Sequence, residues 1–136
     1  VHVFERATLE PAAVWSNPGA GLEDYFGMSL AAGPDLLVVG APGVQFEARP
    51  SAGAAWLFEL DGAPAGERVP RRLVSPQPRD YGMFGFAVAL DATRVVVGEP
   101  RGGSPGSGSV HVFALPGAVL DASIPDPTPT AIDMFG

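Results

Sequence analysis

Phe26-Gly27-Met28-Ser29-Leu30 is repeated, with substitutions, as Phe84-Gly85-Phe86-Ala87-Val88. Fourteen residues after the phenylalanine of each copy comes a second motif, Gly40-Ala41-Pro42 or Gly98-Glu99-Pro100. A third copy would begin at Phe135-Gly136. Self-similarity at a fixed spacing is the sequence signature of a repeat architecture. This pattern therefore decides the fold class.

Further apolar elements recur in the same order around these motifs. A β-branched or leucine run precedes the second motif of each copy. An aromatic-containing stretch follows it, and its copies are Val1-His2-Val3-Phe4, Ala55-Trp56-Leu57-Phe58 and Val110-His111-Val112-Phe113. Another apolar position lies 11 residues before the phenylalanine of each Phe-Gly, at Trp15, Leu73 and Ile124. Length differences fall only between the elements, as a stack of equivalent units predicts.

Each of the four elements has the composition of a β-strand. They are short, rich in Val, Leu, Phe and Trp, and bounded by Gly, Pro, Asp and Ser clusters. No window shows sustained helical periodicity. Four strands in a unit of roughly 50 residues fit a propeller blade. We predict an all-β fold, a β-propeller fragment of four-stranded antiparallel blades; the alternative is an ordinary β-sandwich whose internal similarity is accidental.

The repeat predicts about two complete units and part units at both ends. Residues 1–17 are expected to form the outer half of one blade, 26–76 and 84–124 two further blades, and 135–136 the start of the next. Terminal units of such an array leave an apolar face uncovered. We therefore expect contact with neighbouring blades of a parent chain, or self-association.

Composition excludes several classes of protein. The chain has 136 residues, with 8 Lys and Arg against 15 Asp and Glu, a net charge of −7, and no basic cluster, so nucleic-acid binding is not expected. The absence of cysteine excludes disulfides, thiolate zinc sites and cysteine nucleophiles. The longest apolar stretch, around 36–39, is far short of the roughly 20 residues that span a bilayer, so we expect no membrane insertion.

No side chains are predicted to be catalytic. His2 and His111 occupy the same repeat position, which is Trp56 in the middle copy, so we interpret this as an aromatic packing or rim position. Three of the serines, Ser29, Ser75 and Ser107, have no patterned base nearby. With only two histidines, the chain offers few residues for nucleophilic catalysis or for a metal site of several histidines. We predict no catalytic, cofactor-binding or metal-binding residues, no cofactor, and a protein that is not an enzyme.

Charged residues near the motifs admit two interpretations. Carboxylates precede each Phe-Gly by two to four residues, at Glu23-Asp24, Asp80 and Asp133. They could be a ring of ligands at one end of the propeller, or solvated turn residues that cap loops; turn chemistry favours the second. The run Arg68 to Arg72 is a small basic spot, interpreted as surface.

The motif residues themselves have roles in stability. Phe26 and Phe84 are predicted to anchor the core between blades. The glycine after each phenylalanine suits a bent or closely approached backbone. Pro42 and Pro100 lack a donor and suit a strand end that leads into a loop.

Phe-Gly followed by Gly-Ala-Pro resembles the FG-GAP repeat of integrin α-subunit propellers and many bacterial surface proteins. The second copy departs from the pattern at Glu99. The resemblance implies a non-catalytic, extracellular or cell-surface scaffold for protein or carbohydrate binding or adhesion, with any signal peptide outside this chain. Variable loops would carry recognition, here Val44–Ala52 and Arg101–Gly108. The alternative is an accessory module of a larger secreted enzyme whose catalytic domain lies elsewhere.

The resemblance also raises the question of a calcium site, because metal-binding members of the family bind calcium in a loop between the two motifs. The corresponding segments here, 31–35 and 91–93, offer one carboxylate each, Asp35 and Asp91. A calcium site needs 6–8 oxygen ligands. We therefore predict tight turns and no calcium site, a short-repeat form that lacks the calcium loop.

Overall fold

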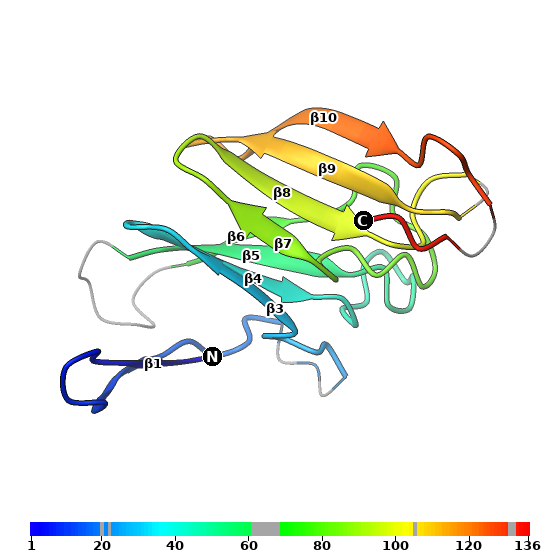
Figure 1. The fold of residues 1–136 in the computed structure, drawn as a ribbon. Helices are drawn as coiled ribbons and strands as arrows, with labels where there is room; N and C mark the ends of the chain where they lie inside the picture. The colour runs from blue at the N-terminus through cyan, green and yellow to red at the C-terminus, as the bar shows by residue number, and fades with distance from the viewer. Residues whose placement is uncertain (20, 22, 61–68, 105, 131–132) are drawn as a thin grey trace.

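The computed structural model describes the chain except residues 20, 22, 61–68, 105 and 131–132. The described residues form ten strands and their connections, with no helix among them (Figure 1). Accordingly, no described helix could cross a membrane. The strands form one two-stranded and two four-stranded antiparallel sheets.

The first sheet is a hairpin at the N-terminus, made of β1 (His2–Phe4) and β2 (Pro11–Val14). The second sheet has the order β3-β4-β5-β6, and its strands are β3 (Ser29–Ala32), β4 (Leu36–Ala41), β5 (Ala54–Glu59) and β6 (Arg71–Leu73). The third has the order β7-β8-β9-β10, and its strands are β7 (Val88–Leu90), β8 (Arg94–Glu99), β9 (Ser109–Ala114) and β10 (Val119–Pro125). The all-β prediction with four-stranded antiparallel sheets is confirmed.

The two four-stranded sheets share one register. Trp56 of β5 lies opposite Val39 and Arg72, and in the next sheet His111 of β9 lies opposite Val97 and Ser123. The N-terminal hairpin pairs His2 with Val14 at the corresponding place. Residues at matched repeat positions therefore occupy matched sheet positions, and the two sheets can be compared residue by residue.

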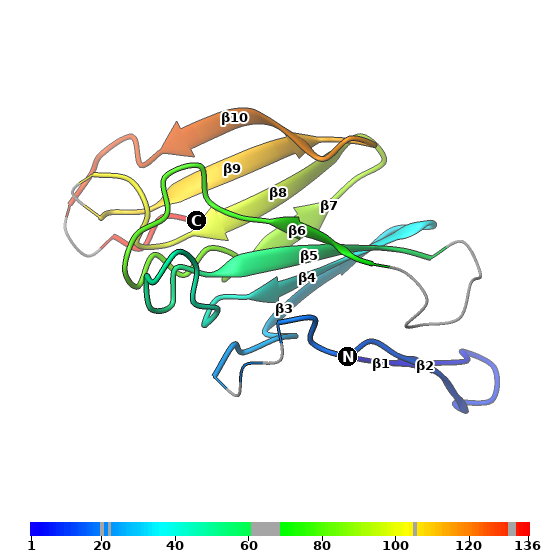
Figure 2. The same ribbon diagram turned by 180° about the vertical axis from the view of Figure 1, so that it is seen from behind.

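The sheets stack face to face, and the core lies between them (Figure 2). Alternate residues of β4 point to opposite sides, because successive side chains on a strand do so. One side belongs to a cluster shared with the N-terminal hairpin: Trp15, Leu37, Val39, Ala41, Val44, Ala54, Trp56 and Phe58. The other side belongs to a cluster shared with the third sheet: Val38, Ala55, Leu57, Leu73, Phe84, Val95, Val97 and Phe113.

Phe84-Gly85 joins the third sheet to the second. Phe84 is fully buried in the cluster between the two large sheets, which confirms its predicted role as an anchor between blades. Its backbone N–H donates to the Ala52 carbonyl at 3.0 Å, beside a parallel bridge between Phe84 and Gly53. The third Phe-Gly repeats this contact: the Phe135 N–H donates to the Ser107 carbonyl at 2.8 Å.

Glycine is required where this joint brings two backbones together. Gly85 has φ +89°, and a Cβ on it would lie 2.2 Å from the Ala54 carbonyl oxygen. Gly40 faces it, and a Cβ there would lie 2.0 Å from the Gly85 carbonyl oxygen. Real Cβ atoms do not approach backbone this closely, so Phe-Gly and Gly-Ala-Pro are the two halves of one joint between sheets.

Candidate functional site

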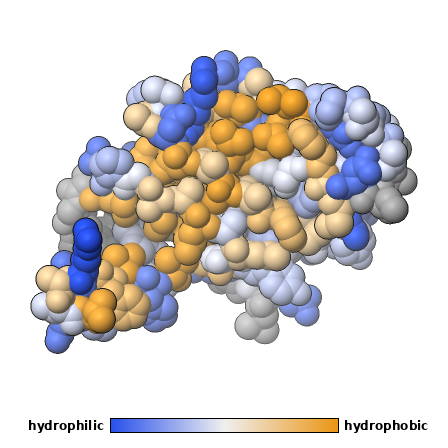
Figure 3. Space-filling model, viewed as in Figure 1, coloured by the Kyte–Doolittle hydropathy of each residue, from blue (hydrophilic) through white to orange (hydrophobic). Residues whose placement is uncertain are grey.

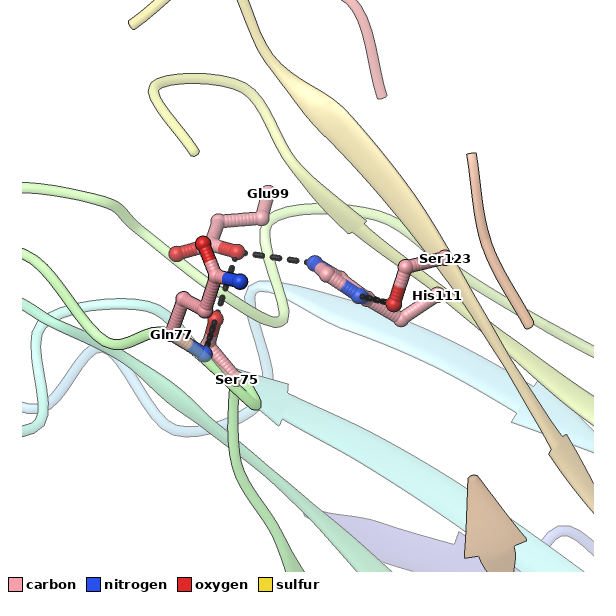
Figure 4. A network of polar contacts seen from close by, with 5 residues as sticks. All are labelled: Ser75, Gln77, Glu99, His111 and Ser123. Atoms are coloured by element: carbon pink, nitrogen blue, oxygen red, sulfur yellow. Dashed lines mark hydrogen bonds and ion pairs between the residues drawn. The ribbon is translucent and has the colours of Figure 1, made fainter. Parts of the chain in front are cut away.

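A buried polar network lies on the face of the third sheet that packs against the second (Figure 4). Glu99, at the end of β8, is 1% exposed, and His111 of β9 is 4% exposed. His111 Nε2 lies 2.8 Å from Glu99 Oε2, and its Nδ1 lies 2.9 Å from Ser123 Oγ on β10. Ser75, which follows β6 of the second sheet, donates its hydroxyl to the same Glu99 oxygen at 2.8 Å. The network therefore connects the two sheets.

The network holds the imidazole of His111 in one orientation. A neutral ring with its proton on Nε2 donates to Glu99 and accepts from the Ser123 hydroxyl. A protonated ring would donate to both. In either state, both ring nitrogens are satisfied, as a buried polar side chain requires.

Three of the four equivalent positions in the second sheet are apolar, and the fourth is an arginine. Glu99, Ser109, His111 and Ser123 correspond in register to Ala41, Ala54, Trp56 and Arg72. There the Arg72 guanidinium carbon lies 5.5 Å from the ring centroid of Trp56 and 4.9 Å from that of Phe46. The indole and the guanidinium cover this part of the second sheet, whereas the third sheet has shorter polar side chains.

A cavity of about 260 Å³ adjoins the network in the third sheet. Its floor includes the buried side chains of Ser109 and His111, and its mouth includes the exposed residues Gln77, Ser104 and Ser123. Ser104 belongs to the loop 101–108 that we expected to carry recognition, of which Pro105 lies outside the described residues. A predicted variable loop and a polar cavity thus coincide.

The Glu99 carboxylate occupies the place of an aspartate in the preceding unit. Asp24, two residues before Phe26, accepts hydrogen bonds from Asn17 Nδ2 at 2.8 Å and from the Gly21 N–H at 3.0 Å. The corresponding residue before Phe84 is Gly82, where an added Cβ would lie 2.6 Å from Glu99 Oε1. The two units therefore place the carboxylate at different positions. The first has Asp24 before its Phe-Gly and Ala41 in its second motif, and the next has Gly82 before its Phe-Gly and Glu99 in its second motif.

The residues that these carboxylates meet are equivalent as well. Asn17, Ser75 and Asp126 each lie nine residues before a Phe-Gly, and each is followed by proline. Their side-chain oxygens accept a hydrogen bond from the backbone N–H two residues on, at 2.9, 3.2 and 2.8 Å respectively. These are the local side-chain-to-backbone turns that such residues favour.

Two of the carboxylates before a Phe-Gly, Asp24 and Asp133, accept hydrogen bonds from residues of the connection in which they lie. Asp133 accepts hydrogen bonds from the hydroxyl and the backbone N–H of Thr130, and these bonds lower the pKa of Asp133. Asp80 is exposed. Asp24 differs from the expected solvated turn residue because it is buried, with Asn17 and Gly21 as its hydrogen-bond donors.

The other sequence candidates are dispersed. His2 is exposed and stacks on Phe4 at 6.4 Å between ring centroids. Ser29 donates its hydroxyl to the Gly85 carbonyl at 2.9 Å, and so contributes to the joint between sheets. In the basic run, Arg71 Nη1 donates to the Pro116 carbonyl at 3.1 Å, while Arg68 lies outside the described residues.

The turn at Asp91 uses its carboxylate internally. Asp91 Oδ1 accepts from the Thr93 N–H at 2.6 Å, the Thr93 hydroxyl at 2.9 Å and the Arg94 N–H at 2.9 Å. The backbone and side-chain hydrogen bonds from Thr93 lower the pKa of Asp91. Among the described residues, no three His, Cys, Asp or Glu side chains gather in a geometry suited to a metal. The Asp91 turn thus already uses one carboxylate oxygen for three hydrogen bonds of its own.

We expect the melting temperature to be the same in millimolar calcium and in chelator at fixed ionic strength. Calcium bound only to the native state would raise stability by RT ln(1 + [L]/Kd), about 2.7 kcal/mol at a hundredfold excess over Kd. Thermal melts of the wild-type chain and of Asp35→Ala and Asp91→Ala measure this. A saturable rise that either substitution removes would contradict the expectation.

The stacked four-stranded sheets and their repeated glycine joints define a protein of the β-propeller repeat class. The FG-GAP repeat family matches residues 18–58 and 71–113, and the chain belongs to that family. No curated protein sequence matches it.

Proposed function

We propose that the chain is part of a non-catalytic, extracellular or cell-surface β-propeller that binds a protein or carbohydrate ligand through its loops. The observation that carries this proposal is a pair of cavities beside the loops that follow β4 and β8. The first, of about 540 Å³, includes Asp24, Tyr25, Gln45 and Ser51 in its lining. The second is the 260 Å³ cavity beside His111. In both units, therefore, the loop after the Gly-Ala-Pro-type motif borders a hollow.

Binding of the immobilised chain to arrays of glycans and extracellular-matrix proteins tests this function. A reproducible, saturable ligand supports it. Absence of any ligand from both arrays, with the chain shown to be folded by circular dichroism, would overturn it.

The second candidate function is an accessory module of a secreted enzyme. The flanking reading frame separates the two: a hydrolase domain beside the repeats supports this candidate, and further repeats with a signal peptide or anchor support the scaffold.

We also infer that the outer face of the third sheet contacts a neighbouring blade or a second copy. Leu73 is covered by the third sheet and is only 3% exposed, whereas its equivalent Ile124 is 47% exposed. Val38 is fully buried, whereas its equivalent Val96 is only partly buried. Apolar residues gather on this side of the molecule (Figure 3). Burial of such a surface stabilises by about 25 cal/mol per Å².

We expect the chain alone to self-associate or to be marginally stable. Sedimentation velocity across a hundredfold range of concentration, with a parallel thermal melt, measures both properties. A monodisperse monomer with a cooperative, high-temperature melt would contradict the inference.

A further inference from the structure

We propose that the 260 Å³ cavity beside the Glu99–His111 pair binds a single sugar ring. This inference rests on the proposed function, because it names the ligand class of one of the two loop cavities. It is carried by the comparison between the two sheets, by the hydrogen-bonding groups of the cavity and by its size.

The comparison shows that the fold does not need buried polar side chains on these strand positions, although the preceding unit also buries a carboxylate nearby, at Asp24. In the second sheet the same four positions hold two alanines, a tryptophan and an arginine, with Arg72 over the Trp56 ring. Burying Glu99, Ser109 and His111 instead removes polar groups from water, which costs free energy unless hydrogen bonds compensate. When one unit has polar side chains where the other unit has mostly apolar ones, and packing does not improve, a functional site is the expected reason.

The lining of the cavity suits a neutral ligand that both donates and accepts hydrogen bonds. The hydroxyls of Ser104, Ser109 and Ser123 and the amide of Gln77 can each do both. Glu99 Oε2 already accepts from Ser75 and His111, while Oε1 is buried near Gly82 and has no hydrogen-bond partner among the described residues, so neither oxygen is open to the cavity. The carboxylate therefore orients the ring of His111 and does not present its charge to an incoming cation.

The size of the cavity favours a ligand smaller than a typical drug molecule, such as one sugar ring. Its 260 Å³ lies just below the range of about 300–1,000 Å³ for drug-sized ligands, and corresponds to roughly eight or nine waters at about 30 Å³ each. Pro76 and Pro125 border it and offer apolar surface for the C–H face of a sugar. The hydrogen bonds of His111 and Ser123 hold part of its floor and part of its mouth in place before any ligand binds.

The inference is tested by two-dimensional ¹H–¹⁵N NMR titration of the full chain. The probes are glucose, galactose, mannose, fucose and N-acetylglucosamine, with n-butylammonium as a cationic probe. We expect saturable shifts for at least one sugar at the amides of Gly103, Ser104, Ser109 and His111, and none for n-butylammonium. Shifts with n-butylammonium alone, or no shifts at these amides with any sugar, would overturn the inference.

Two variants place the binding in the cavity. Ser123→Arg introduces at the cavity mouth the residue that the second sheet has at this position, and should weaken sugar binding at least tenfold. Ala122→Arg adds the same charge to the neighbouring residue of β10, which faces the opposite side of the sheet, and should leave binding unchanged. Both residues are exposed, and a thermal melt of each variant checks its fold. Equal weakening by the two variants would overturn the assignment to the cavity.

The same variants separate this inference from the proposed function. An array ligand that binds the wild-type chain and Ser123→Arg equally overturns the sugar cavity and leaves the scaffold function standing. If no array ligand binds but a free sugar produces saturable shifts at the cavity amides, the loop-scaffold function is overturned and the cavity inference stands.

Discussion

Gly85→Ala is expected to destabilise the chain by roughly 2–6 kcal/mol, because Gly85 lies at the joint between sheets. Two costs combine. A residue other than glycine at φ +89° carries backbone strain of about 1–3 kcal/mol. Its Cβ would also lie 2.2 Å from the Ala54 carbonyl, and relief of such overpacking costs about 1–3 kcal/mol more. Urea unfolding followed by tryptophan fluorescence measures the change.

Two other glycines separate strain from steric clash. Gly106 has φ +101°, but the nearest atom to its added Cβ is 3.8 Å away, so Gly106→Ala tests backbone strain alone and should cost about 1 kcal/mol. Gly40 has no positive φ, but its Cβ would lie 2.0 Å from the Gly85 carbonyl, so Gly40→Ala tests the close approach. If Gly106→Ala destabilised as much as Gly40→Ala, the joint would not be the reason for glycine in these motifs.

Glu99→Ala is expected to cost about 3–5 kcal/mol, because it leaves the buried side chains of His111 and Ser75 without their shared partner. Gly82→Asp alone should also destabilise, because the new side chain would meet Glu99 Oε1. Together, Gly82→Asp and Glu99→Ala recreate the Asp24–Ala41 arrangement of the preceding unit. The double variant should therefore be more stable than the sum of the single effects predicts.

A double-mutant cycle in urea measures this coupling, which for residues in contact reaches about 0.5–3 kcal/mol. The matched control pairs Asp80→Ala with Glu99→Ala, since Asp80 is exposed and precedes the same Phe-Gly by four residues. That pair should be additive. Additivity in the Gly82–Glu99 cycle as well would contradict this prediction. It would show that the Asp24–Ala41 and Gly82–Glu99 arrangements are not equivalent.

The fold was largely predictable because the same sequence motifs occur in more than one copy. Strand order follows from the recurring Phe-Gly and Gly-Ala-Pro motifs, and the register follows from their constant spacing. Their glycines sit at the joint between sheets, where a side chain would strike backbone. The predicted anchor role of Phe84 follows from the same repeat, since an aromatic residue at a sheet-to-sheet contact buries a large area.

The Glu99–His111 pair was not predicted, although a signal for it exists. Both residues depart from the other copy within the same unit, where Ala41 and Trp56 stand. In register, Glu99 lies opposite Ser109, and His111 is two residues further along the same face. Diagonal neighbours of this kind can interact, so two simultaneous departures at such positions are an indication of a pair. Treating His111 only as an equivalent of Trp56 concealed it.

Ser75 and Ser123 could not have been assigned to the network from spacing. Ser75 reaches Glu99 from the connection that leaves the second sheet, so the contact depends on how two sheets pack. Ser123 meets His111 across β9 and β10, where a bulge between Leu120 and Ala122 shifts the pairing. A bulge changes which residues lie opposite each other, and the repeat pattern does not reveal its position.

The joint between sheets has a direction. The Phe-Gly of one unit sits on the Gly-Ala-Pro end of the unit before it, so the two surfaces in contact differ, as in a head-to-tail interface between subunits. Repetition of one such contact produces either a closed ring or an open superhelix, according to the rotation per step. Here that rotation is set where Gly40 meets Gly85 and where Gly98 meets Gly136, with backbone against backbone. Side chains such as Glu99 and His111 can therefore change from unit to unit while the curvature of the array stays the same.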